Sequence, residues 1–414
     1  MRRIVIVGAS AAGSAAAEAI RRLDRGCQLI LISDEPVPLY SRCLLSDYLV
    51  GEVTPARLAF QRPDWPKVLD VQVIQDRAVE VDPRAGEVRT ARGQWVGYDG
   101  LLLATGASAV TPSIPGLHTG GVFALYQLQQ VEAALAVLER AQDVVVLGAG
   151  KVGVKAAEAG AVRGRRVTLV EQARQPLIGA LDEVGGTLVR RLLEQHGVTV
   201  RTGVTLTEVR ERNGTVNEVV LSTGEQLPCQ ALLVSVGGRP NAGLAHQAGA
   251  QVAEGVVVDQ RLRTTLEGVY AAGDVAESPA LHGTRPAVLA NWINAVQQGR
   301  IAGRNLAGQE TVYSGGIRTN SLRLWKLPTI SVGEVTGEGE WSLDEERGFY
   351  RRLIFQEGRL TGFMQVGGDI RDAGIFSALI KSGERVDEPQ KLFAGGFFHF
   401  QAQRTRWALA GVAM

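Results

Sequence analysis

Short apolar runs that end on glycine-rich turns divide the chain, and one such arrangement occurs twice. Residues 4–8 read IVIVG and lead through the turn GASAAG into an alanine-rich stretch that ends at about Arg22, after which the run QLILIS follows. Residues 144–148 read VVVLG and lead through GAGKVG into a stretch that ends at about Arg163, followed by RVTLV. Each copy predicts a buried strand, a tight turn, a helix and a second strand.

An acidic residue follows the second strand of each copy. It is Glu35 in the first copy, with Asp34 as the alternative, and Glu171 in the second. This is the pattern of a dinucleotide-binding unit, because missing side chains let the backbone approach a pyrophosphate at the helix N-terminus and the acid can bind a ribose hydroxyl. The predicted pyrophosphate-binding turns are Gly8, Ala9, Ser10, Ala11, Ala12 and Gly13 in the first copy, and Gly148, Gly150, Lys151, Val152 and Gly153 in the second.

Three later apolar runs also close on glycine: LLLATGA at 101–107, LLVSVGG at 232–238 and VYAAGDV at 269–275. Each is typical of a late strand in a parallel sheet that is buried on both faces. A helix is expected from about Pro286 to Asn305. Beyond it, residues 321–335 and 351–367 predict strands, and residues 368–383 predict a turn and an amphipathic helix. The fold class is therefore α/β, with two Rossmann-like dinucleotide-binding domains and an α+β C-terminal domain.

Composition and charge narrow the function. The net charge is +1, from 44 basic and 43 acidic residues, so bulk electrostatics favour neither nucleic acid nor an anionic membrane surface, and neither is expected as a partner. No apolar run reaches about 18 residues, so no membrane insertion is expected. The basic and apolar start of the chain is similar to a signal peptide, but the same pattern recurs mid-chain, which favours a strand. Three scattered cysteines indicate a cytoplasmic protein, and the histidine spacing predicts no metal site.

The motifs GASAAG, LLLATGA, GAGKVG, VGGRPN and VYAAGDV occur in the order typical of the pyridine nucleotide–disulfide oxidoreductases, and the chain resembles that family over residues 4–310. Within the family, the chain resembles the branch of ferredoxin, rubredoxin and nitrite reductase-like enzymes. The resemblance implies an FAD-binding domain at 1–110 and 239–310, an NAD-binding domain at 111–238, and a C-terminal interface domain at 311–414 through which a homodimer could form.

The resemblance also adds cofactor contacts. For FAD it implies Arg42 near the phosphates, Asp274 on a ribityl hydroxyl, and a helix N-terminus near Thr284 to Ala287 at the flavin. The remaining implied FAD contacts are Val79, Ala104, Thr105, Gly106 and Gly273, and Gly237 is implied for NAD. Glu171 favours NADH because a carboxylate repels a 2′-phosphate, whereas the nearby Arg174 keeps NADPH open.

Two features of residues 40–51 are open to interpretation. Cys43 stands where single-cysteine members of the family carry a redox cysteine, and the alternative is a small packing residue. Asp47 and Lys155 occupy positions where related electron transferases carry a lysine and a glutamate near flavin N5, so we predict the same ion pair with its charges exchanged. Cys27 and Cys229 are expected to be packing residues.

Three functions follow from these observations. The first is an FAD-dependent NADH oxidoreductase that exchanges electrons with a protein acceptor, such as ferredoxin, rubredoxin or an iron–sulfur subunit. The second is a coenzyme A or small-thiol disulfide reductase, or an NADH oxidase-like enzyme, that uses Cys43. The third is a non-catalytic flavin subunit of a larger complex. The tail 392–414, rich in Phe and Arg, is either a docking surface or internal packing.

Overall fold

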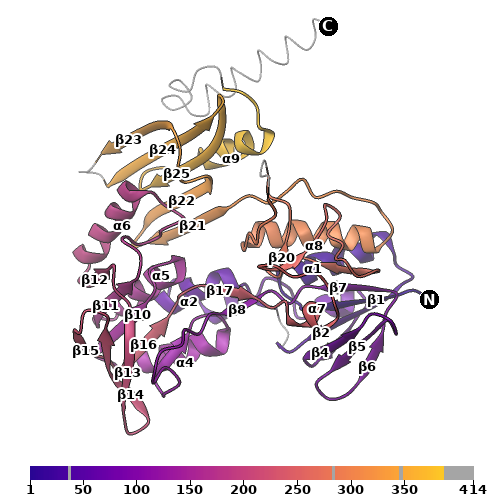
Figure 1. The fold of residues 1–414 in the computed structure, drawn as a ribbon, viewed down its shortest axis with the longest axis horizontal. Helices are drawn as coiled ribbons and strands as arrows, with labels where there is room; N and C mark the ends of the chain where they lie inside the picture. Colours follow the sequence, from indigo (N-terminus) through magenta and orange to yellow (C-terminus); the bar gives the residue numbers. More distant parts are fainter. Residues whose placement is uncertain (36–38, 282–284, 345–347, 387–414) are drawn as a thin grey trace, which may run out of the picture. The chain divides into compact units, whose positions relative to one another are not determined.

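The computed structural model describes residues 1–35, 39–281, 285–344 and 348–386 (Figure 1). The chain forms two compact units. The first contains residues 1–112, 124–133 and 237–317, and the second contains residues 113–123, 134–236 and 318–414. Three separate segments therefore build each unit. The predicted division into three domains stays a prediction.

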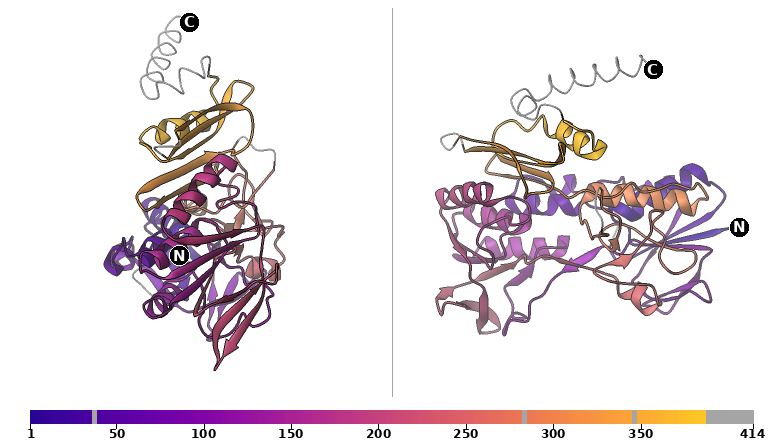
Figure 2. Two further views of the ribbon diagram at one scale, coloured as in Figure 1. Left: turned by 90° about the vertical axis from the view of Figure 1, so that its left-hand side faces the viewer. Right: turned by 45° about the horizontal axis from the view of Figure 1, so that its top comes forward.

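A parallel sheet of order β19-β7-β1-β2-β3 forms the centre of the first unit. Its strands are β1 (Arg3–Val7), β2 (Gln28–Ser33), β3 (Val71–Gln75), β7 (Gly100–Leu103) and β19 (Val269–Ala271). The first three strands of the order carry almost only buried apolar side chains, as expected for a parallel sheet covered on both faces. The helices α1 (Ala11–Leu23) and α8 (Trp292–Leu306) pack closely together (Figure 1 and Figure 2).

Glycines allow the close packing of these two helices. A Cβ atom at Gly299 would lie 2.1 Å from the carbonyl oxygen of Ala12, and one at Gly303 would lie 2.6 Å from that of Ala16. Both distances are shorter than a van der Waals contact, so a larger side chain would force the helices apart.

Shorter elements surround this sheet. The helical segments are η1 (Arg42–Leu44), α2 (Leu45–Val50), η2 (Pro55–Arg57), α3 (Trp65–Val68) and α7 (Gly243–Gln247). The strands are β4 (Ala78–Asp82), β5 (Glu87–Thr90) and β6 (Trp95–Gly97) in one small sheet, with the pairs β8 (Ala107–Ala109) and β17 (Gly238–Pro240), and β18 (Val256–Val257) and β20 (Ala276–Glu277).

The second unit contains a sheet of order β12-β11-β10-β16-β9, in which the pairs among the first four strands are parallel. These strands are β9 (Val122–Ala124), β10 (Asp143–Leu147), β11 (Arg166–Glu171), β12 (Val198–Thr202) and β16 (Ala231–Val234). The helices are α5 (Lys151–Ala161) and α6 (Glu183–Gln195), together with the part of α4 (Leu128–Leu138) that follows residue 133. The strands β13 (Leu206–Arg212), β14 (Thr215–Leu221) and β15 (Gln226–Pro228) form a small antiparallel sheet.

An antiparallel sheet of order β21-β22-β25-β24-β23 follows in the same unit. It consists of β21 (Thr319–Leu324), β22 (Leu327–Gly333), β23 (Gly339–Asp344), β24 (Phe349–Gln356) and β25 (Arg359–Val366), with α9 (Ala373–Ser382) packed on it. The strands and the helix predicted for this part are confirmed. The predicted α/β class is confirmed as well. The tail 392–414 lies outside the described residues. Across the described residues, every helix is too short or too polar to span a bilayer.

Candidate cofactor-binding site

The first glycine turn connects β1 to α1 and is closed by backbone contacts. Gly8 has a φ of 105°, and a Cβ atom there would lie 2.2 Å from the carbonyl oxygen of Ala104 at the end of β7. A Cβ atom at Gly13 would lie 1.8 Å from the carbonyl oxygen of Gly8. Only glycine fits either position, and the turn leads directly into the N-terminus of α1.

This helix N-terminus suits an anion. Ser10 is the N-cap residue and makes no side-chain capping bond, and the first turn of α1 contains no acidic residue. The first amide groups and the positive end of the helix dipole are therefore not neutralised by an acid of the helix itself. The turn fits the pyrophosphate that the sequence predicts.

A second close crossing lies beside this turn. Asn241 donates from its side chain to the carbonyl oxygen of Thr105 at 2.9 Å, and the Thr105 hydroxyl donates to the Asn241 carbonyl oxygen at 2.9 Å. The Asn241 amide also donates to Gly106, whose φ is 64° and whose missing side chain leaves open space. Hydrogen bonds thus join the motifs LLLATGA and VGGRPN, and through them Asn241 positions the predicted contacts Thr105 and Gly106.

The Gly273–Asp274 pair is positioned by a buried glutamine of α8. Gln298 is 2% exposed; its side-chain oxygen accepts from the Gly273 amide at 2.7 Å, and its amide donates to Ser278 at 2.9 Å. The predicted start of this helix near Pro286 is wrong. It begins at Trp292, because Asn291 accepts from the amide of Asn294 and caps the helix there.

The expected helix N-terminus at the flavin, near Thr284 to Ala287, is therefore misplaced. Ala287 pairs with Ser278 in a β-bridge instead. Thr284 lies outside the described residues.

The two candidate ribose acids differ in their surroundings. Asp34 is exposed, and its nearest ion-pair contact with Arg77 is 3.8 Å long. Glu35 is half-buried and ion-paired with Arg42, the predicted phosphate ligand. Burial and the hydrogen bond to Glu35 raise the pKa of Tyr40 to about 12, so this phenol stays protonated as a donor to Glu35. Glu35 is the better positioned acid.

Tyr126 is a residue that the sequence did not identify. The Arg42 guanidinium lies 5.6 Å from the centre of its ring and donates to its backbone oxygen at 3.2 Å. Burial and the negative charge of Asp274 raise the pKa of Tyr126 to about 12. A Cβ atom at Gly238 would lie 3.1 Å from its hydroxyl. Tyr126 thus lies among residues expected at FAD, although no motif surrounds it in the sequence.

The second glycine turn repeats the geometry of the first within the second unit. A Cβ atom at Gly148 would lie 2.3 Å from the carbonyl oxygen of Ser235, and one at Gly153 would lie 1.8 Å from that of Gly148. Gly150 is the N-cap of α5 and has open space around it. Glu171 accepts from the amides of Ala149 at 2.6 Å and Ala173 at 2.7 Å. Its carboxylate is therefore fixed beside the turn.

The remaining predicted residues are placed as follows. Lys151 and Val152 open α5, Val79 lies on β4, and Gly237, with a φ of 105° and open space around it, accepts from the amide of Val110 in the first unit.

Cys43 is exposed and lies in η1, and Asp47 lies in the first turn of α2. Cys27 and Cys229 are buried, as predicted. Burial raises the pKa of the Cys27 thiol and raises that of Cys229 to about 12, so neither is a reactive thiolate at neutral pH.

Lys155 is 2% exposed in its side chain, and its Nζ atom forms an ion pair with Glu158 at 2.8 Å within the second unit. The Asp47–Lys155 pair joins residues of different units and stays a prediction.

Comparison with known proteins identifies the family. The family model for pyridine nucleotide-disulphide oxidoreductases matches residues 2–299. The chain belongs to this family. It is 31% identical to the NADH-dependent phenylglyoxylate dehydrogenase subunit epsilon of Aromatoleum evansii, with 91% of each chain covered. It is 33% identical to a rubredoxin-NAD(+) reductase of Pseudomonas putida, over 74% of this chain and 80% of that one.

A solved structure, the ferredoxin reductase of Rhodopseudomonas palustris, superposes with a TM-score of 0.90 at 26% identity and covers 98% of this chain and 100% of its own. Membership of the family confirms that the protein is an oxidoreductase that uses FAD and NADH. The two glycine turns and the fixed acids Glu35 and Glu171 fit these two nucleotides.

Proposed function

We propose that the protein passes electrons from NADH to a separate iron–sulfur protein, such as a ferredoxin, a rubredoxin or an iron–sulfur subunit. The observation that carries this proposal is the presence of two complete nucleotide-binding turns, each with a fixed acid, in a chain similar to ferredoxin and rubredoxin reductases. Bound FAD supplies the conversion between two-electron and one-electron chemistry. A relative named as a dehydrogenase subunit supports a partner within a complex.

The first unit is proposed to hold FAD. The turn from Gly8 to Gly13 and the N-terminus of α1 bind the pyrophosphate, Glu35 binds the adenosine ribose, and Arg42 binds a phosphate oxygen. Asp274, on the segment held by Gln298, binds a ribityl hydroxyl. Val79, Ala104, Thr105, Gly106 and Gly273 are the remaining proposed contacts.

Tyr126 is proposed as an addition to this set. Its ring is fixed by Arg42 and its hydroxyl stays protonated beside Asp274, so it can pack against the cofactor and donate a hydrogen bond to it.

The second unit is proposed to hold NADH on the turn from Gly148 to Gly153. Glu171 accepts the ribose hydroxyls, and its fixed negative charge disfavours the 2′-phosphate of NADPH. Arg174, which would favour a phosphate, is exposed and lies 3.9 Å from Glu183. Lys151 and Val152 are the remaining proposed contacts of this unit, and Gly237, which belongs to the first unit, stays a proposed NAD contact.

Anaerobic titration with NADH tests the proposal. We expect the flavin absorbance of the holoenzyme to bleach at about one NADH per FAD, and a [2Fe–2S] ferredoxin or a rubredoxin added afterwards to restore it. Bleaching that neither protein reverses would contradict the proposal. Flavin that NADH does not bleach would instead support the non-catalytic subunit.

A thiol reductase is the second candidate function, because the Cys43 side chain is exposed. A NAD-dependent persulfide reductase of A. fulgidus superposes with a TM-score of 0.84 at 26% identity. Titration of Cys43→Ser distinguishes the two functions. A redox role requires that wild type takes up a second two-electron equivalent that the variant does not. Identical titrations would leave Cys43 as a packing residue.

The Asp47–Lys155 ion pair is proposed as a positioning contact near the flavin. Coupling between Asp47→Asn and Lys155→Met in a double-mutant cycle of NADH oxidation would support the pair, and additive effects would contradict it.

We also propose a cytoplasmic location and a homodimer through residues 311–414. Light scattering of the full chain and of a chain shortened by that segment tests the dimer.

A further inference from the structure

Leu177 has a backbone conformation that leucine does not favour. It lies on the loop between β11 and α6, its φ is 56°, and it is 2% exposed. Glycine and asparagine adopt this left-handed conformation at low cost, whereas a leucine is strained in it. Strain of this kind persists only where surrounding contacts impose it, and it is frequent at ligand-binding sites. The contacts of Leu177 therefore point to its function.

The backbone of Leu177 closes this loop on the second glycine turn. Its amide donates to the carbonyl oxygen of Ala149 at 2.9 Å. The amide of Ala149 donates in turn to the carboxylate of Glu171 at 2.6 Å. Both backbone groups of Ala149, which is 1% exposed, are therefore held by the end of β11 and the loop that follows it.

Further contacts fix the loop itself. The carbonyl oxygen of Leu177 accepts from the amide of Leu181 at 3.0 Å. The buried side chain of Gln175 donates to the carbonyl oxygens of Leu181 at 3.2 Å and Asp182 at 2.8 Å. Asp182 is the N-cap of α6, and its carboxylate accepts from the hydroxyl of Tyr350 on β24 at 2.5 Å. The end of the loop is thus anchored by contacts that do not involve the glycine turn.

The hydrogen bond from Leu177 also sets the direction of the next amide in the turn. The carbonyl of Ala149 and the amide of Gly150 belong to one peptide, and a trans peptide directs these two groups to opposite sides. The Gly150 amide is therefore directed away from the loop. Gly150 is the N-cap of α5, and a Cβ atom there would have nothing within 4 Å.

We propose that Leu177 is a positioning residue for NADH, and that its constrained backbone aims the Gly150 amide at the pyrophosphate. A donor that is fixed before the ligand arrives loses little freedom on binding, which increases the affinity for a charged group. The strain in Leu177 is then the cost of a preorganised turn. The inference rests on the proposed placement of NADH on this turn, and the experiment separates the two.

Binding of two nucleotide fragments to the oxidised holoenzyme tests this role. ADP-ribose carries the pyrophosphate, whereas adenosine carries the ribose proposed for Glu171 and no phosphate. Neither fragment contains nicotinamide, so neither reduces the flavin. Calorimetry measures the dissociation constant of ADP-ribose directly and that of adenosine by competition.

The main variant is Leu177→Ile, which keeps the apolar volume but places a β-branched side chain where φ is 56°, a conformation that such side chains resist. Leu177→Met keeps the volume without the branch and is the matched control at the same position. Leu262→Ile is the control at a second position, because Leu262 is also buried and has a φ of 63° but lies in the first unit.

FAD content and melting temperature verify that each protein is folded. If Leu177→Ile is not folded, Leu177→Gly takes its place, because glycine accepts this φ without strain and no longer restrains the loop.

We expect Leu177→Ile to bind ADP-ribose about 10-fold more weakly than wild type, the effect of weakening one hydrogen bond to a charged group, and to bind adenosine as wild type does. Both controls should bind both fragments as wild type does. Equal binding of ADP-ribose by Leu177→Ile and wild type, or an equal loss of affinity for the two fragments, would overturn the role of Leu177.

Glu171→Ala separates this result from the proposed function. If it weakens the binding of neither fragment, the placement of NADH on the turn is wrong, and the role of Leu177 with it. If Glu171→Ala weakens both fragments and Leu177→Ile weakens neither, the placement of NADH stands and only the role of Leu177 is wrong.

Discussion

The buried ion pair of Lys155 and Glu158 allows a quantitative test of packing within the second unit. Both side chains are 2% exposed, and Nζ lies 2.8 Å from a Glu158 oxygen. The other oxygen accepts from the amide of Trp325 at 2.7 Å, and Lys155 also donates to the carbonyl oxygen of Arg323 at 3.0 Å. The pair therefore joins α5 to the hairpin of β21 and β22. Removing one partner of such a pair costs about 3–5 kcal/mol.

The substitution Glu158→Gln removes the charge and keeps an acceptor for Trp325. Because 1 kcal/mol shifts the melting temperature of a unit of this size by about 2–4 °C, we expect a decrease of about 10 °C. Circular dichroism of the holoenzyme on heating measures it. The matched control is Glu139→Gln, which breaks a pair with Arg163 whose acid is 64% exposed, and it should shift the temperature by about 2 °C at most.

The same experiment includes Lys155→Met and the double variant Lys155→Met/Glu158→Gln. If the pair contributes as argued, the double variant is less destabilised than the sum of the two single variants. Additive effects, or equal shifts for Glu158→Gln and Glu139→Gln, would refute the reasoning.

Three further predictions concern other parts of the molecule. Gly299→Ala should lower the melting temperature and the FAD content, because its Cβ atom would lie 2.1 Å from the Ala12 carbonyl oxygen, whereas Gly243→Ala, with nothing within 4 Å, should change neither. Glu171→Ala should raise the KM for NADH about 10–100-fold, because one hydrogen bond to a charged group is lost, and should reduce the preference for NADH over NADPH. An unchanged KM for NADH would contradict the assignment of Glu171 to the ribose. The pKa of Tyr40 is raised to about 12, so its contribution to stability is complete below about pH 10 and is lost as the pH rises toward 12. The melting temperature of Tyr40→Phe should therefore fall less steeply than that of wild type between about pH 10 and pH 12. Equal slopes for the two proteins would contradict this role of Tyr40.

The repeated nucleotide-binding unit was predictable because its signals are local. The first helix was expected to end at about Arg22 and ends at Leu23, and the second was expected to end at about Arg163 and ends at Ala161. The start of α8 differs from the prediction because Asn291, five residues after Pro286, caps the helix, and asparagine is a recognised N-cap signal.

The hairpin of β21 and β22 could not be predicted in detail. Its two turn residues, Trp325 and Lys326, have φ values of 41° and 75°. Glycine or asparagine normally occupies such positions, so the sequence does not predict this turn. Contacts from distant segments accompany this turn. Glu158 accepts the Trp325 amide, and the ring of His196 stacks on the Trp325 side chain with centroids 4.0 Å apart. Neither partner is near the turn in the sequence.

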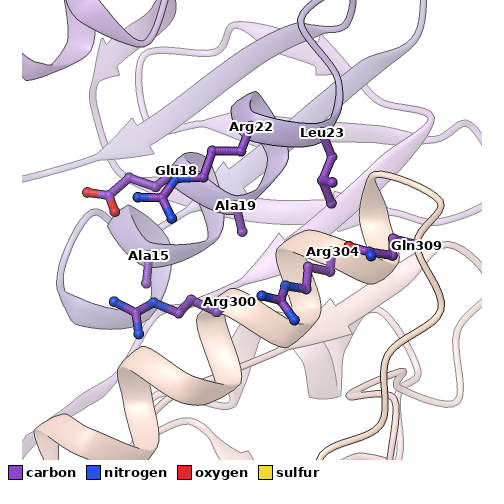
Figure 3. Close-up of a pocket in the computed structure, with 8 residues that line it drawn as sticks. All are labelled: Ala15, Glu18, Ala19, Arg22, Leu23, Arg300, Arg304 and Gln309. Carbon is purple, nitrogen blue, oxygen red and sulfur yellow. The ribbon is translucent and has the colours of Figure 1, made fainter.

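The groove between α1 and α8, which Arg22, Arg300 and Arg304 line, is a similar case (Figure 3). Arg300 and Arg304 are four residues apart, so the sequence places them on one face of a helix, but nothing local connects them to Arg22 of α1. The three come together because Gly299 and Gly303 let α8 approach the backbone of α1 closely enough for both helices to line one groove. A larger side chain at either glycine should therefore separate the two helices and change the groove, although neither glycine lines it. The groove thus depends on the spacing of two helices, which is set by contacts between segments far apart in the sequence.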